Sequence, residues 1–117
     1  MAKNIFSIVK VRNAFKKEPN LEVVNASNIR INGVLKGCSG FVVNKDTNKC
    51  VYFTTEHSVL DSLGFMYREA FDTKSYGGTG TGPNTWEKSF DGLINSIVKT
   101  LNNPKIHFND NKEWRWS

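Results

Sequence analysis

Cysteine and histidine are scarce in this chain of 117 residues, which contains two of each. Two cysteines are too few for the disulfide framework of a small secreted domain. The chain also lacks any run approaching the roughly 18 apolar residues that a membrane-spanning helix requires. Its first residues have none of the apolar stretch found in signal peptides. These absences predict a cytoplasmic protein that makes no contact with a membrane.

The spacing of the two cysteines also argues against a single bridge between them. If residues 45–48 form a hairpin turn, facing residues have numbers that sum to about 93, so Cys50 faces Val43 or Asn44. Cys38 then lies further along the ladder, on the order of 17–20 Å away at 3.3 Å per residue. This separation exceeds the reach of a disulfide, so we expect both thiols to be reduced.

Acidic residues are missing from the first seventeen positions, which contain Lys3, Lys10, Arg12, Lys16 and Lys17. The formal net charge is +5, and the first 50 residues hold nine basic and three acidic side chains, whereas the remainder holds seven and eight. A basic block of this kind binds phosphates or steers association with an acidic protein face. A solvated helix face that keeps the protein soluble is the alternative interpretation.

The hydrophobic pattern of the first third of the chain predicts a helix followed by strands. Residues 3–17 fit a helix, although the β-branched run at 5–11 also fits a strand. Alternating residues then predict strands at 21–25 and 28–35, joined by a turn at 25–28. The predicted apolar face of the helix consists of Ile5, Ile8, Val9 and Phe15.

The clearest hairpin signal lies in the middle of the chain. Strand-forming residues at 37–44 and 49–55 flank the polar turn. A short helical turn is predicted at 58–63 and another strand at 65–71. Four glycines between 77 and 82 then predict a flexible connector.

A second helix is predicted at 86–101, with Thr85 as its N-cap. The tail at 105–117 is rich in aromatic residues, so we expect it to dock on the sheet or to line an interface. Together these elements predict one α+β domain over 1–117, an antiparallel sheet of four to five strands covered by one or two helices. The predicted buried face of the second helix consists of Trp86, Phe90, Leu93, Ile94, Ile97, Val98 and Leu101.

No combination of residues forms an enzyme signature. The glycine-rich segment at 77–82 lacks the lysine and the spacing of a phosphate-binding loop, and a connector is the better interpretation. Cys38 and His57 could pair across the hairpin, but a metal would need Cys50 and His107 as further ligands, and this spacing matches no zinc motif. We therefore expect a non-enzymatic protein without catalytic residues, metal ligands or cofactor.

Aromatic residues next to basic ones suggest contact surfaces. Tyr52-Phe53 and Tyr67-Arg68 on two strands would suit a stacking platform for nucleic acid, or else pack in the core. In the tail, Trp114-Arg115-Trp116 combines residue types that are enriched at interaction hot spots. The alternative for this cluster is a tail strand that packs its own tryptophans.

Residues 51–101 resemble a domain of phage and mobile-element proteins, the large polyvalent protein-associated domains and their small stand-alone relatives. The likeness runs through an aromatic strand at 51–53, Tyr67-Arg68-Glu69-Ala70, Asp72, Tyr76-Gly77-Gly78, Asn84, Trp86 and the closing amphipathic helix. Residues 79–83 are an insertion relative to this pattern. The resemblance implies a small α+β module deployed by a phage or plasmid in the cytoplasm of a bacterial host, and it implies no catalytic residues.

These observations lead to two functional hypotheses. The first is a phage or mobile-element protein that binds and inhibits a host protein or ribonucleoprotein, most concretely an anti-CRISPR protein acting on a CRISPR effector. The second is a basic accessory protein that contacts the nucleic-acid backbone directly. The predicted partner-binding residues are Lys10, Arg12, Lys16, Lys17, Trp114, Arg115 and Trp116.

Overall fold

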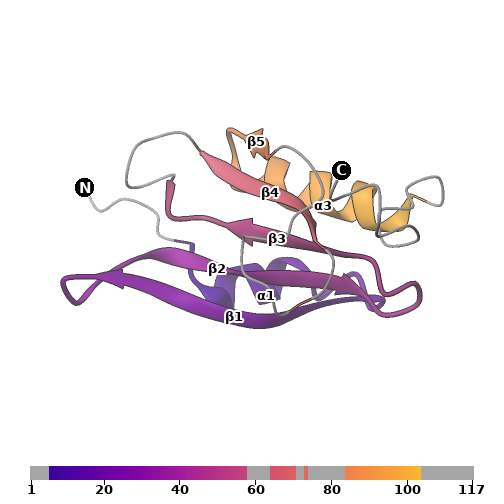
Figure 1. Cartoon of the computed structure of the whole chain (residues 1–117), viewed down its shortest axis with the longest axis horizontal. Coiled ribbons are helices and arrows are strands. Elements are labelled where there is room, and N and C mark those ends of the chain that lie inside the picture. Colours follow the sequence, from indigo (N-terminus) through magenta and orange to yellow (C-terminus); the bar gives the residue numbers. More distant parts are fainter. Residues whose placement is uncertain (1–5, 58–63, 71–72, 74–83, 104–117) are drawn as a thin grey trace, which may run out of the picture.

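The computed structural model describes residues 6–57, 64–70, 73 and 84–103. Five antiparallel strands form one sheet in the order β1-β2-β3-β4-β5, with two helices beside it (Figure 1). This confirms the predicted α+β fold. In chain order the elements are α1 (Ile8–Ala14), β1 (Leu21–Ile31), β2 (Val34–Asn44), β3 (Cys50–Thr54), β4 (Phe65–Ala70), β5 (Thr85–Glu87) and α3 (Phe90–Asn102).

Both helices pack on the same face of the sheet. α1 lies against β1 and β2, whereas α3 lies mainly against β4 and β5. The side chains between helices and sheet form the main core, as expected for a two-layer domain. A smaller cluster of Phe41, Cys50 and Ala70 lies on the second face of the sheet. The buried residues of the main core are Val11, Phe15, Leu21, Val23, Cys38, Val42, Val51, Phe53, Phe65, Tyr67, Leu93, Ile94, Ile97 and Leu101.

The central hairpin forms as the sequence predicts. β2 and β3 pair with Val43 opposite Cys50, one of the two partners predicted for this cysteine. Asn48 in the turn has a φ of 63°, in the left-handed region that asparagine tolerates best among residues with a side chain. Cys38 lies in the main core and Cys50 in the cluster on the second face, and neither is part of a disulfide. The predicted absence of a Cys38–Cys50 bridge is confirmed.

The first hairpin differs from the prediction. β1 is one continuous strand of 11 residues, and the predicted turn at 25–28 is wrong. The register instead slips between the Val24 and Ser27 pairs, which marks a β-bulge, so the chain keeps its direction. The turn lies at Asn32 and Gly33, whose φ values of 52° and 78° fit the type I′ turn typical of two-residue hairpins.

A close approach of two backbones explains the form of the bulge. Gly40 of β2 faces it, and a Cβ atom on Gly40 would lie 2.5 Å from the Cβ atom of Ala26. No side chain fits in that gap, because real Cβ atoms do not approach so closely. The glycine therefore makes room for the extra residue of β1.

α1 is shorter than the predicted helix over 3–17, and its apolar face is different. Residues 15–17 form a turn, and residues 3–5 lie outside the described part of the chain. Val11 and Phe15 point into the core, whereas Val9 is 64% exposed. Placing Val9 on the buried face was wrong, because Val11 and Phe15, four residues apart, define that face.

α3 begins four residues later than predicted. Ser89, and not Thr85, is its N-cap, and its hydroxyl accepts a hydrogen bond from the Gly92 amide at 2.9 Å. Trp86 belongs to β5, where it faces Met66, so its predicted place on the buried helix face was wrong. The rest of the periodic pattern is confirmed, with four buried residues from Leu93 to Leu101.

β4 confirms the strand predicted at 65–71 over its described residues. The predicted helical turn at 58–63, the glycine-rich connector at 77–82 and the tail at 105–117 lie outside the described residues.

Candidate functional site

The basic residues predicted at the N-terminus lie on α1 and the turn after it. Val11 and Phe15, one helical turn apart, are buried against the sheet and fix which side of the helix faces outward. Neighbours of a buried helical residue project about 100° to either side of it, so Lys10 and Arg12 flank Val11. The exposed cations are Lys10, Arg12, Lys16 and Lys17. We call these four residues the basic side of α1.

These four cations keep their charges unpaired within the described part of the chain, where none of them makes a salt bridge. The Nζ atom of Lys10 lies 5.1 Å from the centroid of the Phe6 ring, a cation–π contact that leaves the charge in place. Lys17 lines a cleft between α1 and α3. The cations therefore lie on both flanks of the helix, and Asp91 lines the same cleft as Lys17.

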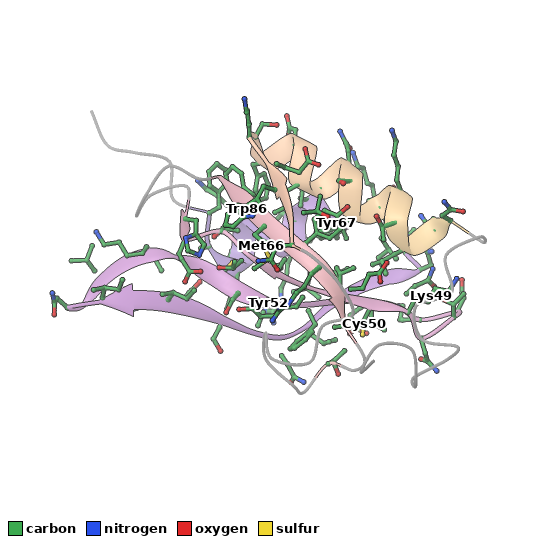
Figure 2. The ribbon with its side chains drawn as sticks, turned by 45° about the horizontal axis from the view of Figure 1, so that its top comes forward. Lys49, Cys50, Tyr52, Met66, Tyr67 and Trp86 are labelled. Carbon is green, nitrogen blue, oxygen red and sulfur yellow. The ribbon has the colours of Figure 1, made fainter. Side chains whose placement is uncertain are left out.

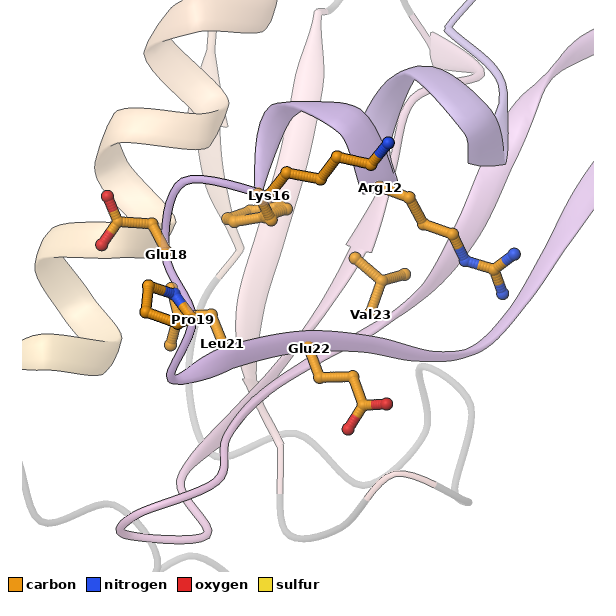
Figure 3. A pocket seen from close by; sticks show the side chains of 8 residues that line it. Arg12, Lys16, Glu18, Pro19, Leu21, Glu22 and Val23 are labelled. Carbon is orange, nitrogen blue, oxygen red and sulfur yellow. The ribbon is translucent and has the colours of Figure 1, made fainter.

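Arg12 and Lys16 border a groove of about 280 Å³ between α1 and β1. Phe15, Leu21 and Val23 contribute apolar side chains to it. The two carboxylates near the groove, those of Glu18 and Glu22, point away from the cations (Figure 3). The groove therefore combines an apolar floor with one guanidinium, one ammonium and two carboxylates around it.

A second exposed feature is the end of the β1–β2 hairpin, residues 29–36, which we call the β1–β2 arm. It runs past the ends of β3 and β4 (Figure 1). Ile31 and Val34 face each other beside the turn and are 40% and 53% exposed. Arg30 precedes Ile31, and Lys36 lies two residues after Val34. The hydrogen bond from the Ile8 amide to Asn28 Oδ1, at 3.0 Å, joins the start of α1 to the base of this arm.

The predicted stacking platform forms only in part. Tyr52 and Arg68 face each other across β3 and β4, with the Arg68 guanidinium 5.7 Å from the centroid of the Tyr52 ring. Phe53 and Tyr67 also face each other, but they point to the opposite side of the sheet and are buried in the main core. The aromatic residues of these two strands therefore do not share one surface.

Trp86 is an aromatic residue that the sequence analysis did not place at the surface. It is 41% exposed and lies on β5 next to Met66 of β4 (Figure 2). The His57 ring packs edge-on against it at a centroid distance of 5.4 Å. His57 in turn lies 3.7 Å from a carboxylate oxygen of Glu56. A carboxylate at this place opposes an anionic ligand, so the patch suits nucleic acid less well than the basic side of α1.

The cysteines have the environment of structural residues. Burial raises the pKa of the Cys38 thiol from 9.0 to about 11, against a smaller opposing effect of its hydrogen bond with Thr55. A thiol held in its protonated form is a poor nucleophile and a poor metal ligand. Within the described residues, no group of three or more potential metal-ligating side chains comes together.

The structure thus brings together four of the seven predicted partner-binding residues. Trp114, Arg115 and Trp116 lie outside the described residues, as do His107 and the glycine-rich segment at 77–82. No helix of the described part is long and apolar enough to cross a membrane. No protein-family model, curated protein or solved structure matches the chain.

Proposed function

We propose that the protein is a non-enzymatic inhibitor from a phage or mobile element, which binds a factor of its bacterial host through the basic side of α1. Its most concrete form is an anti-CRISPR protein that binds a CRISPR effector ribonucleoprotein. Such a target offers acidic protein surface and guide-RNA phosphates, both of which attract exposed cations. Trp114, Arg115 and Trp116 are the proposed aromatic anchors of the same contact.

The observation that carries this proposal is the set of four exposed cations on α1 and the turn after it, which the core fixes in place. Val11 and Phe15 hold α1 against the sheet, so the cations form a preorganised surface. Because the surface is basic, it is unsuited to mimicking DNA and suited to gripping an anion. The resemblance of residues 51–101 to phage and mobile-element domains supports the bacterial setting.

Charge reversal on α1 tests the proposal. The test variant replaces Arg12, Lys16 and Lys17 by Glu. The control variant replaces Lys45, Lys88 and Lys99 by Glu, which changes the net charge equally at exposed positions outside α1. Tagged wild-type protein and both variants are used to capture partners from nuclease-treated bacterial lysate at two salt concentrations.

We expect wild type and control to retain one host protein or ribonucleoprotein after nuclease treatment, and the α1 variant to lose it. A plasmid-interference assay in cells with an active CRISPR effector tests the most concrete form. Wild type and control should protect the target plasmid, and the α1 variant should not. Equal capture by both variants would refute the role of α1, and unimpaired interference with wild type would refute the anti-CRISPR form.

A second candidate function is direct binding of nucleic acid, and the β1–β2 arm favours it. No acidic residue occurs between Glu22 and Asp46, so the whole of β2 and most of β1 carry only positive charge. The arm therefore extends the basic surface beyond α1. Under this function the captured material is nucleic acid, and nuclease or high salt removes it.

A further inference from the structure

The β1–β2 arm is a two-stranded ribbon with a defined reach. The Thr55 amide donates to the Cys38 carbonyl at 2.9 Å, and a Cβ atom on Gly37 would lie 2.6 Å from Thr55 Oγ1, so chain following β3 flanks β2 as far as Gly37. Val34 lies three residues further out, which is about 10 Å at 3.3 Å per residue. Within the described residues, no third strand pairs with the ribbon over this length.

The chemistry of the arm combines an apolar tip with flanking cations. Ile31 and Val34 are the exposed apolar pair, and Arg30 and Lys36 are the nearest charged residues, both basic. An apolar tip between cations is complementary to a ligand that has anionic groups on both sides of a less polar surface. Duplex nucleic acid has this pattern, with phosphates bordering grooves whose floors are base edges.

Two comparisons favour duplex DNA over a protein groove or duplex RNA. Hot spots of protein interfaces are dominated by Trp, Tyr and Arg, and valine is under-represented there, whereas many proteins that bind the minor groove of DNA insert apolar side chains between base steps. The major groove of B-form DNA is roughly 12 Å wide and 8.5 Å deep, and it admits a two-stranded ribbon. The major groove of an RNA duplex is too narrow for side chains to read.

We propose that the β1–β2 arm enters a groove of duplex DNA, with Ile31 and Val34 against the bases. Arg30 and Lys36 contact the phosphates at the rims of the groove. This inference rests on the second candidate function and names its site and ligand.

Fluorescence anisotropy with a labelled 20-base-pair DNA duplex tests the inference, at salt concentrations from 50 to 200 mM. In the tip variant, Ile31 and Val34 are replaced by Ser. We expect it to bind at least about tenfold more weakly, because apolar contact with the bases is lost. Its salt dependence should equal that of wild type, because no phosphate contact has changed.

In the rim variant, Arg30 and Lys36 are replaced by Gln. Each lost phosphate contact should lower the slope of log affinity against log salt by about 0.9. The control replaces Trp86, which is 41% exposed on β5 at the other edge of the sheet, by Ser, and should bind as wild type does. An RNA duplex of the same sequence should bind more weakly than the DNA to the wild-type protein.

Three results would overturn the inference, and each leaves a different part of the argument standing. If the α1 charge reversal abolishes DNA binding while the tip and rim variants bind normally, DNA binding stands and the arm has no part in it. If wild type binds no duplex at 50 mM salt yet captures a nuclease-resistant host factor, the inhibitor proposal stands alone. If the RNA duplex binds at least as tightly as the DNA, the ligand has been misassigned.

Discussion

Replacing Asn44 by Ala tests how the central hairpin and α3 are joined. Asn44 is the last residue of β2 and is only 3% exposed. Its Nδ2 donates to the Leu101 carbonyl at 2.9 Å and to Asn102 Oδ1 at 3.3 Å, and its Oδ1 accepts from the Asp46 amide at 2.9 Å. The carbonyls of the last helical turn lack intrahelical partners. One side chain therefore closes the β2–β3 turn and satisfies the end of α3.

The size of the loss follows from these bonds. A hydrogen bond contributes about 1 kcal/mol net, and a buried group left without a partner costs about 1–3 kcal/mol. Asn44→Ala breaks two bonds near 2.9 Å and a longer one, so we expect unfolding to become easier by about 2–3 kcal/mol. At about 2.1 cal/mol/K of unfolding entropy per residue, this lowers the Tm by about 8–12 °C.

Urea denaturation followed by circular dichroism measures this loss. Asn95→Ala is the matched control, because Asn95 is exposed on α3 and alanine favours a helix; its stability should equal or slightly exceed that of wild type. Asn44→Asp keeps the bond from Asp46 but turns a carboxylate towards two oxygen atoms. Its loss should exceed that of Asn44→Ala at neutral pH and shrink as the pH falls and the carboxyl is protonated. A change below 0.5 kcal/mol for Asn44→Ala would refute this reasoning.

Three further changes test the core and the sheet, each by the free energy of unfolding. Gly40→Ala should cost about 1–3 kcal/mol, because the new Cβ atom would meet Ala26. Adding Ala26→Gly should recover part of this loss. An unchanged stability of Gly40→Ala would contradict the close approach of the two backbones. Tyr67→Phe should cost about 1 kcal/mol through the lost contact of its hydroxyl, 2.6 Å from Ser96 Oγ, and an unchanged midpoint would show that this bond adds nothing. Burial raises the pKa of Cys38 from 9.0 to about 11, so the unfolded state releases this proton at lower pH than the native state. Stability should therefore fall as the pH rises from 9.0 to about 11, and Cys38→Ala should remove this part of the fall; an unaltered profile would contradict it.

The central hairpin was predictable because its signals are local. A polar turn between two strand-forming runs fixes the register to within one residue, and Val43, the observed partner of Cys50, is one of the two predicted. The first hairpin carried an equally local signal, the dipeptide Asn32-Gly33, which is the strongest indication of a two-residue type I′ turn. The predicted turn at 25–28 overlooks this dipeptide. Asn25 does have the positive φ of a turn residue, but there it belongs to a bulge.

Whether Asn25 and Ala26 form a bulge or a turn depends on the residues of the strand that pairs with them. The extra residue at Asn25–Ala26 stays within β1 because Gly40, on another strand, leaves room for it. A similar ambiguity affected Trp86, which lies four residues before Phe90 and so fits the helical period. Pairing with Met66 and the cap at Ser89 place it in β5 instead. The hydrophobic period of one segment does not show that pairing with another strand will remove a residue from the helix.

One part of the candidate site, the cations of α1, was predictable from local sequence, and the other part, the β1–β2 arm, was not. The cations of α1 were predictable because a run of seventeen residues without an acid is visible in the sequence, and exposed charge needs no partner to be inferred. The β1–β2 arm was not, because residues are exposed there only where the chain after β3 stops covering β2. Its position beside α1 depends on a bond between Ile8 and Asn28, which are twenty residues apart. The exposure of the arm depends on where the neighbouring chain ends, which is known only from the folded structure. For this reason the arm variants test the structure more severely than the α1 variants do.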